Sequence, residues 1–211
     1  MAAPEIPEIQ VLEKEKYFTQ ALVRLPNAVP LPALAPSSVR IRTEALSLST
    51  NNFNYAKLGK LLGWWDAHPL PASVPAPYND AAKYGCMNCW GYARVLESTF
   101  AGVEQGTYMF GYLPIGTLPN DLEVAQGAVE GWVVVTSAYR QKLMPIYNKY
   151  RVYPTTKVDE IRRKDDSIAY DCLIEVMVCK LPSNPPYVPF RTRYDKAGGG
   201  RGTHRILCKG R

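Results

Sequence analysis

The chain has 211 residues, of which 46% are hydrophobic and 21% charged, and a formal net charge of +6. This composition excludes collagen, coiled coils and wholesale disorder, and it fits one ordinary globular domain with an appendage. Its longest apolar runs fall far short of the ~20 residues of a membrane span, and its start resembles no signal peptide. We therefore expect a cytoplasmic protein that makes no membrane contact and keeps most of its five cysteines as reduced thiols.

The first 46 residues predict strands and a connector. Two short strands, at 9–12 and 17–23, flank the polar turn 13–16. Residues 26–37 hold four prolines and predict an extended connector. An alternating pattern over 39–46 then predicts a longer strand.

A short helix is expected within residues 50–62, where Ser49, Thr50 or Asn51 can accept hydrogen bonds from its first N–H groups. A proline-rich loop over 66–80 follows. Further strands are predicted at 89–98, 107–113 and 129–135, whereas 139–150 predicts a short helix or turn interrupted by Pro145.

These elements predict a mainly β (α+β) fold, a partly open β-barrel with short helices in residues 1–150. Residues 151–190 are interpreted as a divergent extension, in which 167–180 alternate like one strand that adds to the barrel or pairs with a second copy. The whole net charge falls in residues 191–211, a Gly/Arg-rich tail that we expect to be disordered.

Two stretches resemble a known fold. Residues 38–49 resemble the first long strand of the chaperonin-10-like (GroES-like) barrel of medium-chain dehydrogenase/reductases, and 91–98 with 102–112 are similar to its second signature. Residues 8–150 are most similar to an uncharacterised branch related to quinone oxidoreductases. The shared motifs read Thr50-Asn51-Asn52-Phe53-Asn54-Tyr55-Ala56, Gly63-Trp64-Trp65, Trp90-Gly91-Tyr92-Ala93, Gly111-Tyr112-Leu113-Pro114 and Arg140-Gln141-Lys142-Leu143-Met144-Pro145-Ile146-Tyr147-Asn148-Lys149-Tyr150.

The resemblance implies the catalytic half of an oxidoreductase in truncated form. The 61 residues after Tyr150 are too few for a nucleotide-binding domain, and Gly198-Gly199-Gly200-Arg201-Gly202-Thr203 lacks the dinucleotide fingerprint, so no Rossmann domain is expected. We predict no cofactor, and NADPH only if another chain supplies a nucleotide-binding domain.

The resemblance also implies a substrate cleft just after the strand at 39–46. Asn52 and Tyr55 are the catalytic candidates, because an amide and a phenol can orient a carbonyl oxygen or donate a proton. The candidates for substrate binding are Asn51, Trp65, Tyr92 and Tyr112. The alternatives, which we favour for most of these side chains, are that an asparagine caps the helix and that the aromatic residues form core.

Metal and histidine chemistry is not expected. Cys86 and Cys89 form a Cys-x-x-Cys pair, but the spacing of Cys172, Cys179, His204 and Cys208 matches no common zinc knuckle. Unpaired thiols are therefore favoured over zinc. His68, in the proline-rich loop, is predicted to face solvent rather than to act as a general base.

Three hypotheses remain. The first is a small-molecule enzyme or ligand-binding domain, in which autonomous NAD(P)H-dependent activity is not expected. The second is a non-catalytic homo-oligomeric binding module whose tail, 191–211, contacts RNA or another acidic partner by neutralising phosphates. The third is that the residues after about 151 have no selected role.

Overall fold

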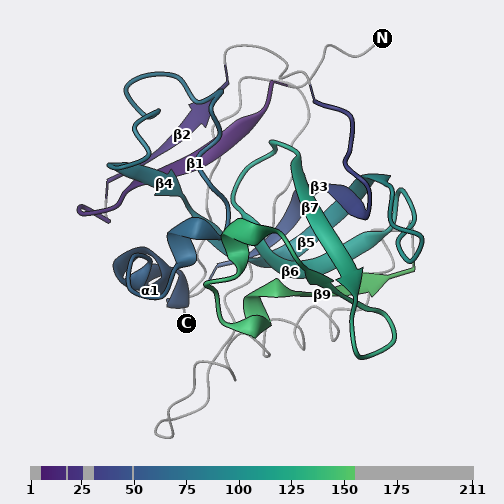
Figure 1. The fold of residues 1–211 in the computed structure, drawn as a ribbon. Helices are drawn as coiled ribbons and strands as arrows, with labels where there is room; N and C mark the ends of the chain where they lie inside the picture. The colour runs from purple at the N-terminus through teal and green to yellow at the C-terminus, as the bar shows by residue number, and fades with distance from the viewer. Residues whose placement is uncertain (1–5, 18, 26–30, 49, 155–211) are drawn as a thin grey trace, which may run out of the picture.

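The structure, a computed structural model, describes residues 6–17, 19–25, 31–48 and 50–154. These residues form a small antiparallel sheet beside a β-barrel, with one short helix and three 3-10 turns packed against them (Figure 1). The prediction of a mainly β, barrel-based fold is therefore confirmed.

The small sheet has the strand order β2-β1-β4. Its strands are β1 (Glu8–Glu13), β2 (Gln20–Arg24) and β4 (Tyr84–Cys86). The hairpin of β1 and β2 matches the two predicted strands, and its alternation buries Ile9 and Val11 on one face. β4 was not expected, because three residues are too few to show a periodic pattern.

The barrel is closed rather than partly open, in the order β3-β5-β6-β9-β8-β7, and β7 pairs back onto β3. Its strands are β3 (Ser38–Ser47), β5 (Asn88–Ser98), β6 (Tyr108–Pro114), β7 (Asn120–Gln126), β8 (Trp132–Val135) and β9 (Lys149–Tyr153). Closure depends on two strands that the sequence pattern did not predict. β7 joins β3 to β8, and β9 joins β8 to β6.

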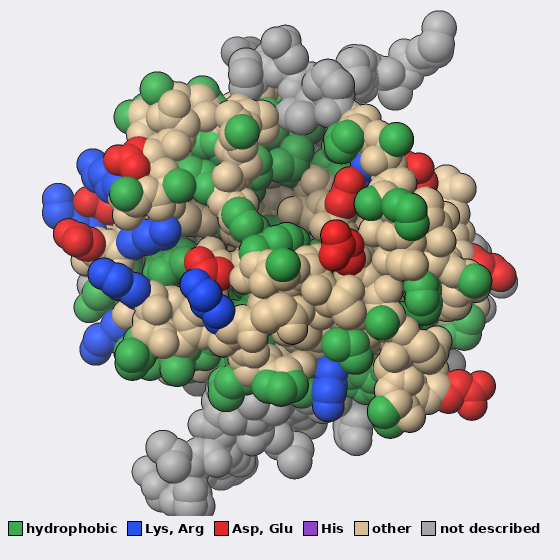
Figure 2. All heavy atoms as spheres, in the orientation of Figure 1, with side chains coloured by type: hydrophobic (Ala, Val, Ile, Leu, Met, Phe, Trp, Pro, Cys, Tyr) green, Lys and Arg blue, Asp and Glu red, His purple; other side chains and the backbone are tan. Residues whose placement is uncertain are grey.

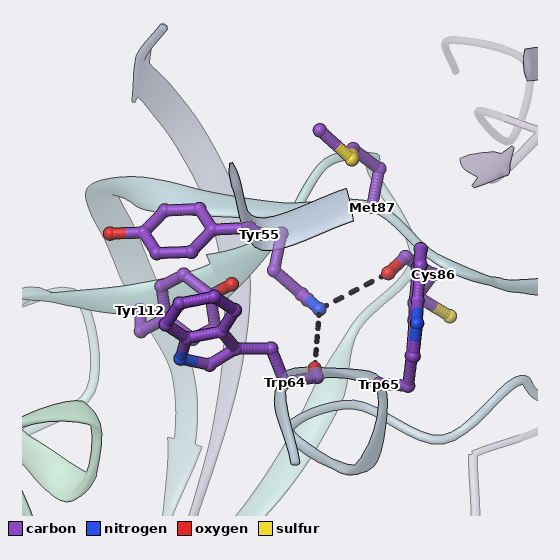
Figure 3. A pocket seen from close by; sticks show the side chains of 7 residues that line it. Tyr55, Trp64, Trp65, Cys86, Met87 and Tyr112 are labelled. Atoms are coloured by element: carbon purple, nitrogen blue, oxygen red, sulfur yellow. Dashed lines mark hydrogen bonds between the residues drawn. The ribbon is translucent and has the colours of Figure 1, made fainter. Parts of the chain in front are cut away.

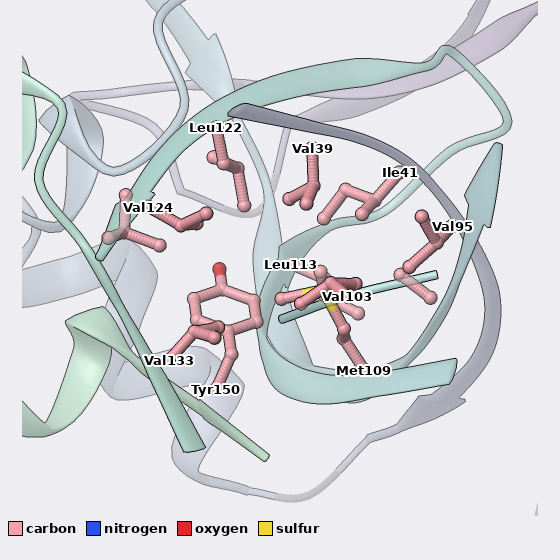
Figure 4. Close-up of a cluster of buried hydrophobic side chains, with 12 residues drawn as sticks. Val39, Ile41, Val95, Val103, Met109, Leu113, Leu122, Val124, Val133 and Tyr150 are labelled. Atoms are coloured by element: carbon pink, nitrogen blue, oxygen red, sulfur yellow. The ribbon is translucent and has the colours of Figure 1, made fainter. Parts of the chain in front are cut away.

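Aliphatic side chains fill the barrel interior, and Figure 4 shows those of several strands converging there. Tyr150 enters this space from β9 and donates its hydroxyl proton to the carbonyl oxygen of Tyr112. The ring lies directly against β6 at Gly111, where a Cβ atom would come within 2.2 Å of it. Glycine is therefore required there by the close approach of an aromatic ring.

An aromatic cluster covers the outer face of β5 and β6. It is completed by α1 (Asn51–Leu58) and by the 3-10 turns η1 (Trp64–Asp66) and η3 (Pro145–Asn148); a third turn, η2 (Ala138–Arg140), lies earlier in the same connection. The cluster consists of the buried residues Tyr55, Trp64, Ala67, Trp90, Tyr92, Tyr108, Phe110, Tyr112, Leu143 and Tyr147. Two buried cores thus share the wall made by β5 and β6.

Several predictions concern residues outside the described part of the chain. These are most of the extension, including the strand at 167–180, and the tail 191–211 with its RNA contact. The zinc candidates Cys172, Cys179, His204 and Cys208 lie there too. Within the described residues, no helix is long and apolar enough to cross a membrane.

Candidate functional site

Three of the predicted site residues meet at one place, which we call the Tyr55 site. Tyr55 comes from α1, Trp65 from η1 and Tyr112 from β6. The residues around this place are Tyr55, Trp64, Trp65, Cys86, Met87, Asn88 and Tyr112 (Figure 3). They pack so closely that no water molecule fits between them. As it stands, the Tyr55 site is closed.

Aromatic contacts fix the Tyr55 phenol. Its oxygen accepts a hydrogen bond of 2.9 Å from Nε1 of Trp90, and its ring meets Trp64 and Tyr112 edge-on at centroid distances of 4.8 and 5.0 Å. Edge-to-face pairs of this kind stabilise a core by about 0.5–1.5 kcal/mol each beyond the area they bury. Through these contacts Tyr55 packs α1 against the barrel.

Asn52 ties α1 to the barrel. Its Nδ2 donates to the carbonyl oxygen of Asn88 at 3.1 Å, and Nδ2 of Asn88 donates to the carbonyl oxygens of Trp64 and Cys86. Nε1 of Trp64 and Oδ1 of Asn88 are buried atoms of this site that have no hydrogen-bond partner among the described residues. A buried polar atom without a hydrogen-bond partner lowers the stability of the fold by about 1–3 kcal/mol. The close packing of the site is therefore achieved at a cost in hydrogen bonding.

The remaining two candidates lie apart from the Tyr55 site. Thr50 occupies the N-cap position of α1, and its side chain makes no capping hydrogen bond. Asn51 lies in the first turn of the helix, where its Oδ1 accepts a hydrogen bond from Nδ2 of Asn54. Tyr92 belongs to the aromatic cluster, where its ring contacts Phe110 and Tyr153. The structure therefore groups Tyr55, Asn52, Tyr112 and Trp65, and separates Asn51 and Tyr92 from them.

An open hollow of about 330 Å³ lies on the other side of Trp65, and we call it the Trp65 hollow. Its lining residues come from the small sheet and the loops next to it, from η1 and the residues after it, and from the segment that begins with η2. The lining residues are Lys14, Trp65, Asp66, Pro69, Leu70, Ala81, Tyr84, Gly85, Ala138, Tyr139 and Lys142. Trp65 is the one predicted site residue that faces both the closed site and the open one.

Two glycines hold the Trp65 indole in place. A Cβ atom on Gly59 would lie 2.5 Å from Nε1 of Trp65, and one on Gly85 would lie 2.6 Å from its Cε3. Both contacts are far closer than side chains tolerate, so each glycine lets the backbone approach the ring. The indole is therefore a rigid wall rather than a mobile lid.

Charged groups surround the Trp65 hollow. Nζ of Lys14 donates to the carbonyl oxygen of Ala81 at 2.7 Å and stands 6.0 Å from the centre of the Trp65 ring. Lys142 and Asp66 also line the hollow. On the face drawn in Figure 2, most Lys and Arg side chains lie over the part that carries the small sheet and α1, with acidic side chains among them. Sequence reasoning missed these lysines because only the fold brings them together.

A buried guanidinium holds the segment next to the hollow. Arg140 is fully buried and donates from Nε to Oδ1 of Asn148 at 3.0 Å, from Nη1 to the carbonyl oxygen of Ala67 at 2.9 Å and from Nη2 to that of Tyr147 at 2.6 Å. Within the described residues no carboxylate lies within 4.0 Å of it, so neutral oxygens satisfy its charge. The network explains why Arg140 and Asn148 occur together in this stretch.

The expectation that His68 faces solvent is wrong, because the side chain is 3% exposed. Its Nε2 lies 2.9 Å from Nη1 of Arg140, which can only donate to it, and 3.1 Å from the carbonyl oxygen of Tyr112. Burial, reinforced by the charge of Arg140, holds the pKa of His68 well below its usual value. His68 is therefore a neutral, structural imidazole.

The Cys-x-x-Cys pair is buried. Cys86 is a free thiol whose Sγ lies 3.6 Å from the carbonyl oxygen of Pro69, and burial raises its pKa to about 12. A thiol in this state is a poor nucleophile and a poor metal ligand. Among the described residues, no group of three or more His, Cys, Asp or Glu side chains could hold a metal ion.

Comparison with models of protein families gives a match. The model of a family described as protein of unknown function (DUF2855) matches residues 46–179. This range includes α1, η1, most of the barrel and the Arg140 network. No curated protein matches the chain.

Proposed function

The chain belongs to the family described as protein of unknown function (DUF2855), and from the geometry of its open hollow we propose that it is a small-molecule-binding barrel domain. The six-stranded antiparallel barrel is the scaffold, and the Trp65 hollow is the binding site. The single observation that carries this proposal is the hollow itself, whose volume of about 330 Å³ lies within the range of small-molecule sites.

The lining of the hollow supports the proposal. Small-molecule sites combine apolar and aromatic walls with a few polar groups that orient the ligand. Here Trp65, Tyr84 and Tyr139 are the aromatic groups, and Lys14 and Asp66 are charged groups of opposite sign. Because two glycines fix the indole, little conformational entropy is lost at the aromatic wall on binding.

The resemblance to the GroES-like barrel of medium-chain dehydrogenase/reductases extends the proposal to the catalytic half of an oxidoreductase-like protein. In this proposal Trp65 contacts the ligand, while Tyr55, Asn52 and Tyr112 support it from behind. Hydride transfer would then require NADPH held by a nucleotide-binding domain on another chain. Contact of the tail, 191–211, with RNA stays a separate prediction, tested by deleting those residues.

Filling the hollow tests the function. Ala81 lines it and Ala82, the next residue, does not, and both are exposed. A fragment library is screened against the full chain by saturation-transfer NMR, and the hits are repeated with Ala81→Trp and with Ala82→Trp as the matched control. We expect hits that Ala81→Trp removes and Ala82→Trp retains. Hits that survive both substitutions, or the lack of any hit, would refute this site.

A further inference from the structure

We infer that the ligand of the Trp65 hollow is an aromatic carboxylate, with its carboxylate at Lys14 and its ring among the aromatic side chains. This inference rests on the proposed function and adds the chemical class of the ligand. It combines the placement of the aromatic residues, the fixed position of one ammonium group and the balance of charge around the hollow.

Aromatic side chains come from all parts of the hollow. Trp65 lies on η1, Tyr84 on β4 and Tyr139 on η2, so that each of the three segments that line the hollow carries a ring. Tyr139 is 40% exposed, which places it at the rim. A flat ring can meet such side chains edge-on or offset-stacked, whereas a flexible aliphatic chain gains no comparable geometry.

The ammonium group of Lys14 is positioned to anchor an anion. Its hydrogen bond to the carbonyl oxygen of Ala81 holds it in place, and two of its three N–H groups remain for other acceptors. It stands 6.0 Å from the centre of the Trp65 ring, so a carboxylate bound to it brings an attached ring next to the indole. Hydrogen bonds between ammonium and carboxylate are about twice as strong as neutral ones.

The charge of the lining favours a single negative charge on the ligand. Lys14 and Lys142 provide two positive charges and Asp66 provides one negative charge, so the described residues of the lining carry one net positive charge. A monocarboxylate neutralises this excess, whereas a cation meets repulsion from both lysines. Asp66 in turn opposes a second negative charge, which selects against dianions.

The test compares 2-naphthoate with its neutral isostere 2-naphthamide in calorimetric titrations of the full chain at low ionic strength. We expect 2-naphthoate to bind with a Kd on the order of 0.1–1 mM, as ligands of this size do in open sites. The amide should bind at least about fivefold more weakly. Raising the salt concentration to about 0.5 M should weaken the binding of 2-naphthoate and leave the binding of 2-naphthamide unchanged.

Variants locate the carboxylate. Lys14→Met should lower the affinity for 2-naphthoate about fivefold or more, and Lys142→Met should lower it about twofold. Asp66→Asn should raise this affinity slightly. Lys57→Met, on the exposed side of α1, is the matched control and should change nothing. Equal affinity for acid and amide would overturn this inference and leave the proposed function intact. If neither probe binds and the fragment screen also finds no ligand in the hollow, both fail.

Discussion

Arg140 and Asn148 bind each other reciprocally across the η2–η3 connection. Nε of Arg140 donates to Oδ1 of Asn148 at 3.0 Å, and Nδ2 of Asn148 donates back to the carbonyl oxygen of Arg140 at 3.1 Å. The same guanidinium reaches the carbonyl oxygen of Ala67, beside η1, at 2.9 Å. One buried side chain thus joins two of the segments that line the Trp65 hollow.

Replacing Asn148 by leucine should destabilise the fold by about 2–4 kcal/mol, because it removes both hydrogen bonds and leaves a buried N–H of Arg140 without its acceptor. Urea unfolding followed by circular dichroism measures the change. Lys149→Leu, at the exposed neighbouring position, is the control and should change stability by less than about 0.5 kcal/mol. Equal effects of the two substitutions would contradict a specific role for the reciprocal pair.

Stability should fall as the pH drops below about 6.5, because His68 has a lower pKa in the folded protein than in the unfolded chain. Below that pH the unfolded chain binds a proton that the folded protein excludes. The cost reaches about 1.4 kcal/mol per pH unit for one group, or about 1 kcal/mol between pH 7 and 5.5.

Unfolding in urea at pH 7.0 and 5.5 measures this loss for the natural chain and for His68→Gln, which keeps a hydrogen-bond acceptor. The variant should lose less stability over the same interval. His204→Gln controls for the second histidine of the chain. Identical pH dependence in the natural chain and His68→Gln would show that His68 does not titrate on unfolding in this range.

Local patterns predicted the strands with long alternating stretches, and they failed where pairing is decided at long range. β3, β5 and β6 lie within one or two residues of their predicted bounds. β7 buries only Leu122 and Val124 between exposed neighbours, too few positions to establish a period. β9 follows directly after the turn at Pro145, and it becomes a strand because β6 and β8 pair with it.

The candidate site shows the same division. Trp65 belongs to the motif Gly63-Trp64-Trp65, which can be recognised in the sequence, and it lines the hollow in the structure. Lys14 and Lys142 are distant in the chain, so no local signal joins them. His68 looked exposed because prolines surround it, yet Arg140, from a remote segment, folds against it. Contacts between remote segments decide which polar residues are buried, and one sequence without homologues does not display them.

Cys86 should resist alkylation in the folded protein. Burial raises its pKa to about 12, so at pH 8 only about one thiol in 10⁴ is ionised, and the side chain is also shielded from reagents. Labelling with iodoacetamide, read residue by residue by mass spectrometry, should be at least about 100-fold slower than in 8 M urea. Rapid labelling of Cys86 under native conditions would show that its surroundings open readily.

The close contact between Gly59 and Trp65 predicts that the effect of Gly59→Ala on stability has opposite signs with and without the indole of Trp65. The backbone of Gly59 is helical, so alanine alone should stabilise this position by up to about 1 kcal/mol. Its Cβ, however, would lie 2.5 Å from Nε1 of Trp65, and forcing the ring aside should cost about 1–3 kcal/mol and narrow the hollow.

Gly59→Ala should therefore destabilise the natural chain and stabilise a Trp65→Ala chain, a coupling that a double-mutant cycle in urea measures directly. Lys60→Ala, at the exposed next position, should have the same small effect in both backgrounds. In the natural chain Gly59→Ala should also weaken ligand binding, because the displaced indole of Trp65 no longer lines the hollow in the same position. Additive effects of Gly59→Ala and Trp65→Ala would mean that the ring is not held by this contact, and the rigid wall assigned to the binding site would have to be abandoned.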